Sequence, residues 1–184
     1  MNYLYYNPLA KNGKCEQEKN EVIAKLEAKY GKFEVNSVIG IDASVFEKFT
    51  AEDMVVILGG DGTLNKFANM AYGKELPCKF YLHKSGTGND FMTDVADAVV
   101  DDMVELNEYV KNLPIITVNG TETRYLNGVG FGIDGMCCVV AEKMKKEGKT
   151  DINYAKITIG LLFKGYTRPN AKVTVDGVTK EYKK

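Results

Sequence analysis

The sequence predicts an α/β fold in which a doubly wound, mostly parallel sheet is followed by the incomplete start of an antiparallel, β-rich domain. The first half alternates β-prone runs with amphipathic helical segments, and short connections between them favour right-handed βαβ units. Residues 54–58 are an unbroken apolar run, which is typical of a strand buried on both faces of a parallel sheet. After residue 110 the pattern changes to pairs of β-prone runs around short turns.

In the first half, the expected helices place apolar residues three and four positions apart, and the expected strands are short β-prone runs. The strands are expected at residues 2–6, 33–39, 53–58 and 79–82. The helices are expected at residues 15–30, 42–49, 63–72 and 99–110.

In the second half, Asn119-Gly120 and Asp176-Gly177 each separate two β-prone runs, which is a strong hairpin signal. The hairpin strands are expected at residues 115–118, 122–126, 172–175 and 178–182, and helices between the hairpins at 133–146 and 154–163. We therefore place a domain boundary between residues 1–110 and 111–184, with Pro114 marking the change.

Length and charge restrict the class of protein. At about 150 residues per domain, 184 residues correspond to about 1.2 domains, which means one large domain or one domain with an incomplete second piece. Because residues 111–184 resemble the start of a second domain and end just after a hairpin, we expect a fragment of a longer protein. The net charge of −1 excludes a polybasic nucleic-acid-binding protein, because such a protein needs excess cations to neutralise phosphates. Residues 1–138 carry a net charge of −7 and residues 139–184 a net charge of +6. The basic segment is either a solvated surface or a face that meets anionic lipid.

The single histidine excludes a multi-histidine metal site. The four cysteines are too few and too scattered for a disulfide framework, so we expect free, buried thiols in a reducing cytoplasm. The longest apolar run is far shorter than the ~20 residues that span a bilayer, and no signal peptide is recognisable. We expect a cytoplasmic protein, with peripheral contact at the inner face of the membrane left open. Residues 155–164 are apolar between lysines and are read as a core helix, with a membrane-surface helix as the alternative.

The central motif is GGDGTLN at residues 59–65, directly after a buried strand and before a helix. Ligands of open α/β sheets bind outside the carboxyl ends of the strands. Glycines let the backbone approach a ligand closely, and the N–H groups at the start of a helix attract anions. An ordinary turn explains one or two glycines but not this whole motif, so we predict phosphate or nucleotide binding.

A second glycine-rich loop, SGTGNDF at residues 85–91, follows the next expected strand. Neighbouring parallel strands place both loops on the same edge of the sheet. A third loop at residues 7–14 follows the first strand and offers Lys11 and Lys14 to phosphate, although an ordinary surface turn explains it equally well. The loops match neither the GxxxxGK[ST] motif nor the GxGxxG fingerprint with its later acidic residue.

GGDGTLN and SGTGNDF, together with Tyr6-Asn7-Pro8, resemble the diacylglycerol kinase catalytic domain family, which includes sphingosine kinases and bacterial lipid kinases. Residues 125–134 are similar to the family's entry into its β-rich lipid-binding domain. The resemblance implies a nucleotide-binding domain at residues 1–110 that is folded like NAD kinase and phosphofructokinase, and a partial lipid-substrate domain at residues 111–184. It implies an ATP-dependent kinase that uses Mg²⁺ and phosphorylates a lipid hydroxyl, as in diacylglycerol or a related alcohol.

Carried over by motif, the implied nucleotide-binding residues are Asn7, Ser37, Gly59, Gly60, Asp61, Gly62, Thr63, Asn65, Gly86, Thr87, Asn89 and Asp90. Asp61 is the candidate to organise the metal or the phosphates, and no metal ligand is assigned. The family's general base is expected beyond Lys184, so we expect the 184-residue chain alone to transfer phosphate poorly. Lys84-Ser85 depart from the family, which often has a proline and a small or apolar residue there.

Two other functions stay open. A small-molecule kinase resembling NAD kinase also uses a GGDG-type loop, although SGTGNDF argues against it. A nucleotide-binding module without catalytic activity is the second alternative. The sequence does not identify the lipid, and it leaves a homodimer open.

Overall fold

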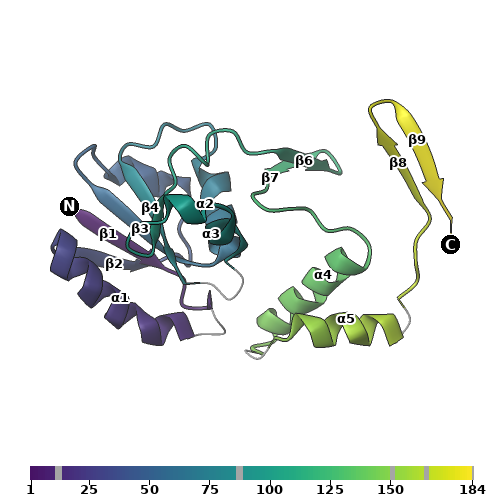
Figure 1. Ribbon diagram of the computed structural model, residues 1–184, viewed down its shortest axis with the longest axis horizontal. Helices are drawn as coiled ribbons and strands as arrows, with labels where there is room; N and C mark the ends of the chain where they lie inside the picture. The colour runs from purple at the N-terminus through teal and green to yellow at the C-terminus, as the bar shows by residue number, and fades with distance from the viewer. Residues whose placement is uncertain (11–13, 86–88, 150–151, 164–165, 184) are drawn as a thin grey trace. The chain divides into compact units, whose positions relative to one another are not determined.

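A five-stranded sheet in the order β2-β1-β3-β4-β5 forms the centre of the first part of the chain (Figure 1). Its strands are β1 (Asn2–Tyr6), β2 (Phe33–Ser37), β3 (Met54–Gly59), β4 (Lys79–Lys84) and β5 (Met103–Glu105). The first four strands run parallel, and β5 is antiparallel to β4. This arrangement confirms the predicted mixed α/β fold with a mostly parallel sheet.

The computed structural model describes residues 1–10, 14–85, 89–149, 152–163 and 166–183. The chain divides into two units, Met1–Gly128 and Val129–Lys184.

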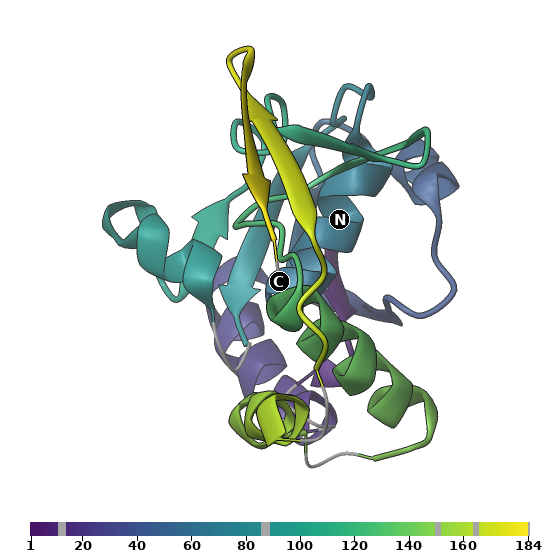
Figure 2. The same ribbon diagram turned by 90° about the vertical axis from the view of Figure 1, so that its right-hand side faces the viewer.

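Helices cover both faces of the sheet (Figures 1 and 2). On one face, α1 (Lys14–Tyr30) packs Leu26 and Cys15 against side chains of β1 and β3. On the other face, α2 (Asp61–Ala71) and the 3₁₀ helix η2 (Ala43–Lys48) cover the sheet. Because apolar helix faces bury both sides of the sheet, its central strand β3 is apolar throughout.

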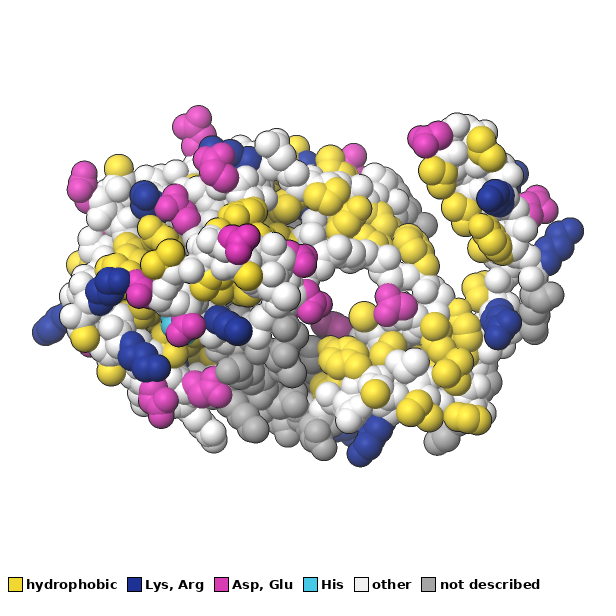
Figure 3. Space-filling view, viewed as in Figure 1, with side chains coloured by type: hydrophobic (Ala, Val, Ile, Leu, Met, Phe, Trp, Pro, Cys, Tyr) yellow, Lys and Arg dark blue, Asp and Glu magenta, His cyan; other side chains and the backbone are white. Residues whose placement is uncertain are grey.

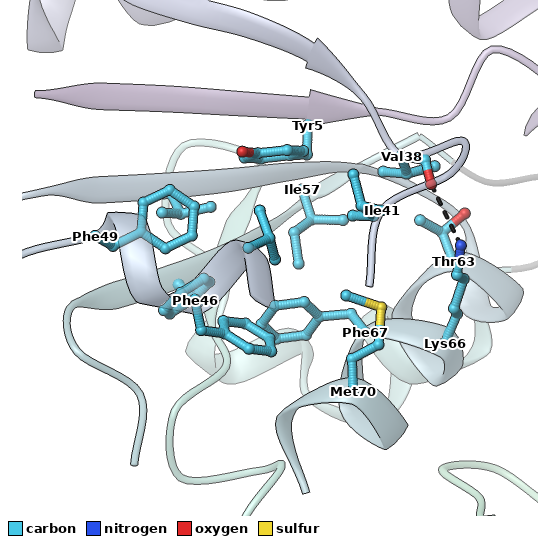
Figure 4. Close-up of a pocket in the computed structure, with 13 residues that line it drawn as sticks. Tyr5, Val38, Ile41, Phe46, Phe49, Ile57, Thr63, Lys66, Phe67 and Met70 are labelled. Carbon is cyan, nitrogen blue, oxygen red and sulfur yellow. Dashed lines mark hydrogen bonds between the residues drawn. The ribbon is translucent and has the colours of Figure 1, made fainter. Parts of the chain in front are cut away.

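Four phenylalanines form the centre of the core under α2 and η2. Neighbouring rings are tilted or edge-on, with centroids 5.1–5.7 Å apart, and the four residues are Phe46, Phe49, Phe67 and Phe80. Beside them lies a cavity of about 20 Å³ with an almost wholly apolar lining (Figure 4). At its edge the Nζ of Lys66 donates a hydrogen bond to the carbonyl of Val38 at 3.3 Å. The cavity has room for about one water molecule, and its apolar lining favours an empty space.

The predicted helix at residues 99–110 is wrong, because β5 occupies its centre. Residues 100–103 instead form a tight turn in which Asp101 and Asp102 have φ angles of 54° and 60°. The Oδ1 of Asn107 then accepts the backbone N–H of Phe80 at 2.9 Å, so that a side chain extends the pairing with β4. The apolar spacing that suggested a helix fits a short strand buried on both faces, and pairing with β4 decides between them.

Two short helices after β4, α3 (Asp90–Asp94) and η3 (Ala96–Ala98), were not expected from the sequence. Elsewhere in the first unit the expected elements are present, with ends that differ by a few residues.

The hairpin of β6 (Ile115–Val118) and β7 (Thr121–Arg124) confirms the Asn119-Gly120 turn, in which both residues have positive φ. The side-chain amide of Asn69 in α2 holds β7. Its Oδ1 accepts the N–H of Arg124 at 2.8 Å, and its Nδ2 donates to the carbonyl of Arg124 at 2.9 Å. The first unit includes this hairpin and extends to Gly128.

The second unit contains α4 (Ile133–Lys146), α5 (Tyr154–Phe163) and the hairpin of β8 (Ala171–Val175) and β9 (Val178–Tyr182). These elements match the expected ones closely. Apolar side chains are exposed along α5 and the hairpin, including Phe163 and Val175 (Figure 3). None of the helices in the described parts of the chain is long and apolar enough to cross a membrane.

All four cysteines are free thiols. Three of them are buried as expected: Cys15, Cys78 and Cys137. Cys138 is exposed, so the expectation of burial is wrong for this residue. It follows Cys137 on α4, and consecutive helical residues face different directions.

Candidate functional site

Three loops meet at the carboxyl ends of the neighbouring parallel strands β1, β3 and β4. The backbone N–H of Asn7, just after β1, donates to the carbonyl of Leu58 in β3 at 2.9 Å. Gly59 in β3 pairs in register with Lys84 in β4. The structure therefore brings both predicted glycine motifs and the Asn7 loop to the same edge of the sheet.

Helix α2 begins at this edge with its first N–H groups unpaired. Gly60 is its N-terminal capping residue and supplies no side chain, while its carbonyl accepts the N–H groups of Thr63 and Leu64. The N–H groups of Asp61 and Gly62 donate to no residue in the described part of the chain. Unpaired N–H groups and the positive end of the helix dipole both favour an anion at this position.

The space in front of α2 is open at Gly62. A Cβ atom built on Gly62 would have no heavy atom of the described residues within 4 Å, and the residue is exposed. The site therefore has room for an anionic group beside the unpaired N–H groups.

Gly59 is required for a different reason. A Cβ atom there would lie 2.6 Å from the Cβ of Thr63 and 2.7 Å from its Oγ1. Real Cβ atoms do not approach so closely, so only glycine lets the end of β3 pass under Thr63.

The side chain of Asn7 holds the first loop against α2. Its Nδ2 donates to the Oγ1 of Thr63 at 2.7 Å, and its Oδ1 accepts the N–H of Leu9 at 3.0 Å. Thr63 is buried, and its hydroxyl proton is left to donate to another acceptor.

The carboxylate of Asp61 joins the two glycine motifs. Its Oδ1 accepts the N–H of Phe91 at 3.1 Å, and its Oδ2 accepts the N–H of Asp90 at 3.2 Å. Asp90 and Phe91 begin α3, and Asn89 precedes them in the left-handed region with a φ of 53°. Gly86 and Thr87, which were also predicted to contact the nucleotide, lie outside the described residues.

Ser37 and Asn65 have separate surroundings. The Oγ of Ser37 accepts the N–H of Ile39 at 3.1 Å, and the residue lines a hollow of about 360 Å³. In the same hollow, the hydroxyl and N–H of Ser44 donate to Asp42 and lower the pKa of its carboxyl group. The Oδ1 of Asn65 is buried without a hydrogen-bond partner among the described residues, and a bound water or ligand donor would satisfy it.

Cys15 was assigned no role from the sequence, yet it lies beneath both glycine motifs. Its Sγ is 3.9 Å from the carbonyl of Leu58 and accepts the hydroxyl of Ser85 at 3.6 Å. These two residues come immediately before the glycines of the two motifs.

The donor set at this edge fits Mg²⁺ that arrives together with phosphate groups. The described residues contain no group of three or more histidine, cysteine, aspartate or glutamate side chains that would hold a metal alone. Mg²⁺ is usually bound through one or two carboxylates and the phosphates of its nucleotide, with several waters. Asp61 and Asp90 are the carboxylates at this edge.

A family model for the diacylglycerol kinase catalytic domain matches residues 2–117. Two solved structures from Bacillus anthracis str. Sterne, both named "putative diacylglycerol kinase", are similar in fold. The first is 20% identical with a TM-score of 0.57 and the second 18% identical with a TM-score of 0.54. The matches cover 98% of this chain but only 61% and 62% of those chains. A search of curated proteins found no match.

Proposed function

Because the chain belongs to the diacylglycerol kinase catalytic domain family, we propose that its first unit binds ATP with Mg²⁺ and serves transfer of the γ-phosphate to a lipid hydroxyl. The observation that supports this most directly is the uncapped start of α2. The N–H groups of Asp61 and Gly62 have no partner among the described residues, and Gly62 is exposed.

Phosphoryl transfer mainly requires that the protein position the phosphates and neutralise their negative charge. In this proposal the backbone of residues 60–62 and the hydroxyl of Thr63 hold nucleotide phosphates. When bound, Mg²⁺ supplies positive charge that neutralises the phosphate oxygens. Asn7 and Asp61 keep the loops in place, because their side chains already bond to other parts of the site.

A methyl group at Gly62 tests the phosphate position. Gly62→Ala fills space in front of α2 and contacts none of the described residues, so we expect ATP affinity to fall at least tenfold while the fold is kept. Gly160→Ala is the matched control, because Gly160 is also a helical glycine with nothing within 4 Å, and it belongs to the second unit. Isothermal titration calorimetry with Mg²⁺-ATP measures both variants.

Two results would contradict the proposal. If the folded wild-type chain does not bind ATP, the proposed ATP-binding function is excluded. If Gly62→Ala binds ATP with unchanged affinity, a phosphate position beside Gly62 is excluded. Transfer is measured separately with radiolabelled ATP and diacylglycerol, a sphingoid base, undecaprenol or NAD as acceptor. Labelling of NAD in place of any lipid would favour a small-molecule kinase.

A further inference from the structure

Asp61 is part of helix α2, and its side chain accepts hydrogen bonds from the first residues of α3. It is the first residue of α2, and its two carboxylate oxygens accept N–H groups from the first two residues of α3. The residues so joined are 29 and 30 positions apart in the sequence.

The first N–H groups of a helix have no partner within the helix, so other groups must satisfy them. In α3 the carboxylate of Asp61 does this for the N–H groups of Asp90 and Phe91. The apolar side of α3 is anchored by Phe91 and Met92, which are buried, and the ring of Phe91 packs edge-on against Tyr109. The core therefore holds the apolar face of α3, and the carboxylate of Asp61 holds its first two residues.

We propose that Asp61 is a positioning residue that sets the start of α3, and with it the SGTGNDF motif, against the GGDGTLN motif. This inference rests on the proposed function for its effect on the nucleotide. Each oxygen of Asp61 accepts one backbone N–H at the start of α3, so in this proposal its influence on the nucleotide acts through α3. If Asp61 were instead a ligand of Mg²⁺, its substitution would weaken ATP binding only when Mg²⁺ is present. A positioning role weakens ATP binding with or without the metal.

Substitution of Asp61 separates the two roles. Asp61→Asn keeps the size of the side chain but turns one acceptor into an N–H donor that faces an N–H group of α3. Asp61→Ala removes both acceptors. Asp53→Asn is the matched control. Asp53 also accepts a backbone N–H, that of Thr50 at 2.8 Å. It lies before β3, whereas Asp61 lies after β3.

Two measurements test the proposal. Amide hydrogen exchange without nucleotide reports the bonds directly. We expect protection of the Asp90 and Phe91 amides in the wild type, about tenfold faster exchange in Asp61→Asn and in Asp61→Ala, and no change in Asp53→Asn. In calorimetry, we expect ATP affinity to fall about five- to tenfold in Asp61→Asn, by the same factor with Mg²⁺ and with EDTA.

Several results would overturn the inference. Unprotected Asp90 and Phe91 amides in the wild type would do so even if the variants failed to fold. Unchanged exchange in a folded Asp61→Asn variant would do so too. A loss of ATP affinity that appears only with Mg²⁺ would assign Asp61 to the metal. If the wild type bound no nucleotide, the proposed function would fail, and the exchange rates would still decide whether Asp61 holds α3.

Discussion

The Nδ2 of Asn7 donates a hydrogen bond of 2.7 Å to the Oγ1 of Thr63, 56 residues later in the chain. This bond joins the loop after β1 to the first turn of α2, and the buried Thr63 hydroxyl has its acceptor role filled by the protein. A side chain that was predicted to contact the nucleotide therefore also holds two loops of the site together.

Asn7→Ala should destabilise the first unit by about 1–2 kcal/mol, because it removes a hydrogen bond from a buried hydroxyl. Urea unfolding followed by circular dichroism measures the change. Asn36→Ala is the control, since the amide of Asn36 bonds only to the exposed carboxylate of Glu34 among described contacts. Equal losses in the two variants would contradict a structural role for the bond between Asn7 and Thr63.

Gly59→Ala should cost about 1–3 kcal/mol of stability, because its methyl group overlaps Thr63 and forces the first turn of α2 to shift. Gly62→Ala adds the same methyl group three residues later with no overlap and should leave the free energy of unfolding nearly unchanged or raised. Thermal unfolding of both variants provides the comparison. The interpretation fails if Gly59→Ala is as stable as the wild type.

The stability of the first unit should fall with acid through Asp53. The ammonium group of Met1 donates to Asp53 at 2.5 Å, and with the N–H of Thr50 it lowers the pKa of the Asp53 carboxyl group. A lowered folded-state pKa contributes stability that is present above the unfolded value of about 3.9 and is lost as pH falls through the folded value.

Asp53→Asn should therefore be less stable than the wild type at pH 7, and the difference should shrink below about pH 4. Urea unfolding from pH 7 to pH 2 measures this, with the exposed Asp97→Asn as control. A difference that stays constant over this range would show that the charge of Asp53 is not responsible.

Asp102→Gly should stabilise the first unit by about 0.5–1 kcal/mol. Asp102 has a φ of 60° in the turn before β5, where a residue with a Cβ atom is strained and glycine is not. Asp101→Gly, at a φ of 54°, should gain less, because Asp101 also bonds to Lys29 and to the hydroxyl of Tyr30. Thermal unfolding ranks the two variants, and a larger gain for Asp101→Gly would contradict this account.

Local patterns in the sequence were sufficient for most of the fold. The apolar run of β3, the helical spacing of α1 and the two hairpin turns each depend on neighbouring residues, so they are visible without a structure. The same holds for the glycine motifs, because their place at a strand end follows from the elements around them. The spacing at residues 99–110 was ambiguous, since it fits a helix as well as a buried edge strand, and pairing with β4 resolved it.

What the sequence by itself determined is the order of strands and helices, the edge at which the two glycine motifs meet, and the family to which they point. Only the tertiary structure decided what the individual side chains do there. Asn7 bonds to Thr63, Asp61 bonds to the start of α3, and Asn69 bonds to Arg124 and so holds β7 against α2. Each of these bonds joins residues that are 29 or more positions apart, and such contacts are set by how the sheet and helices pack rather than by local sequence.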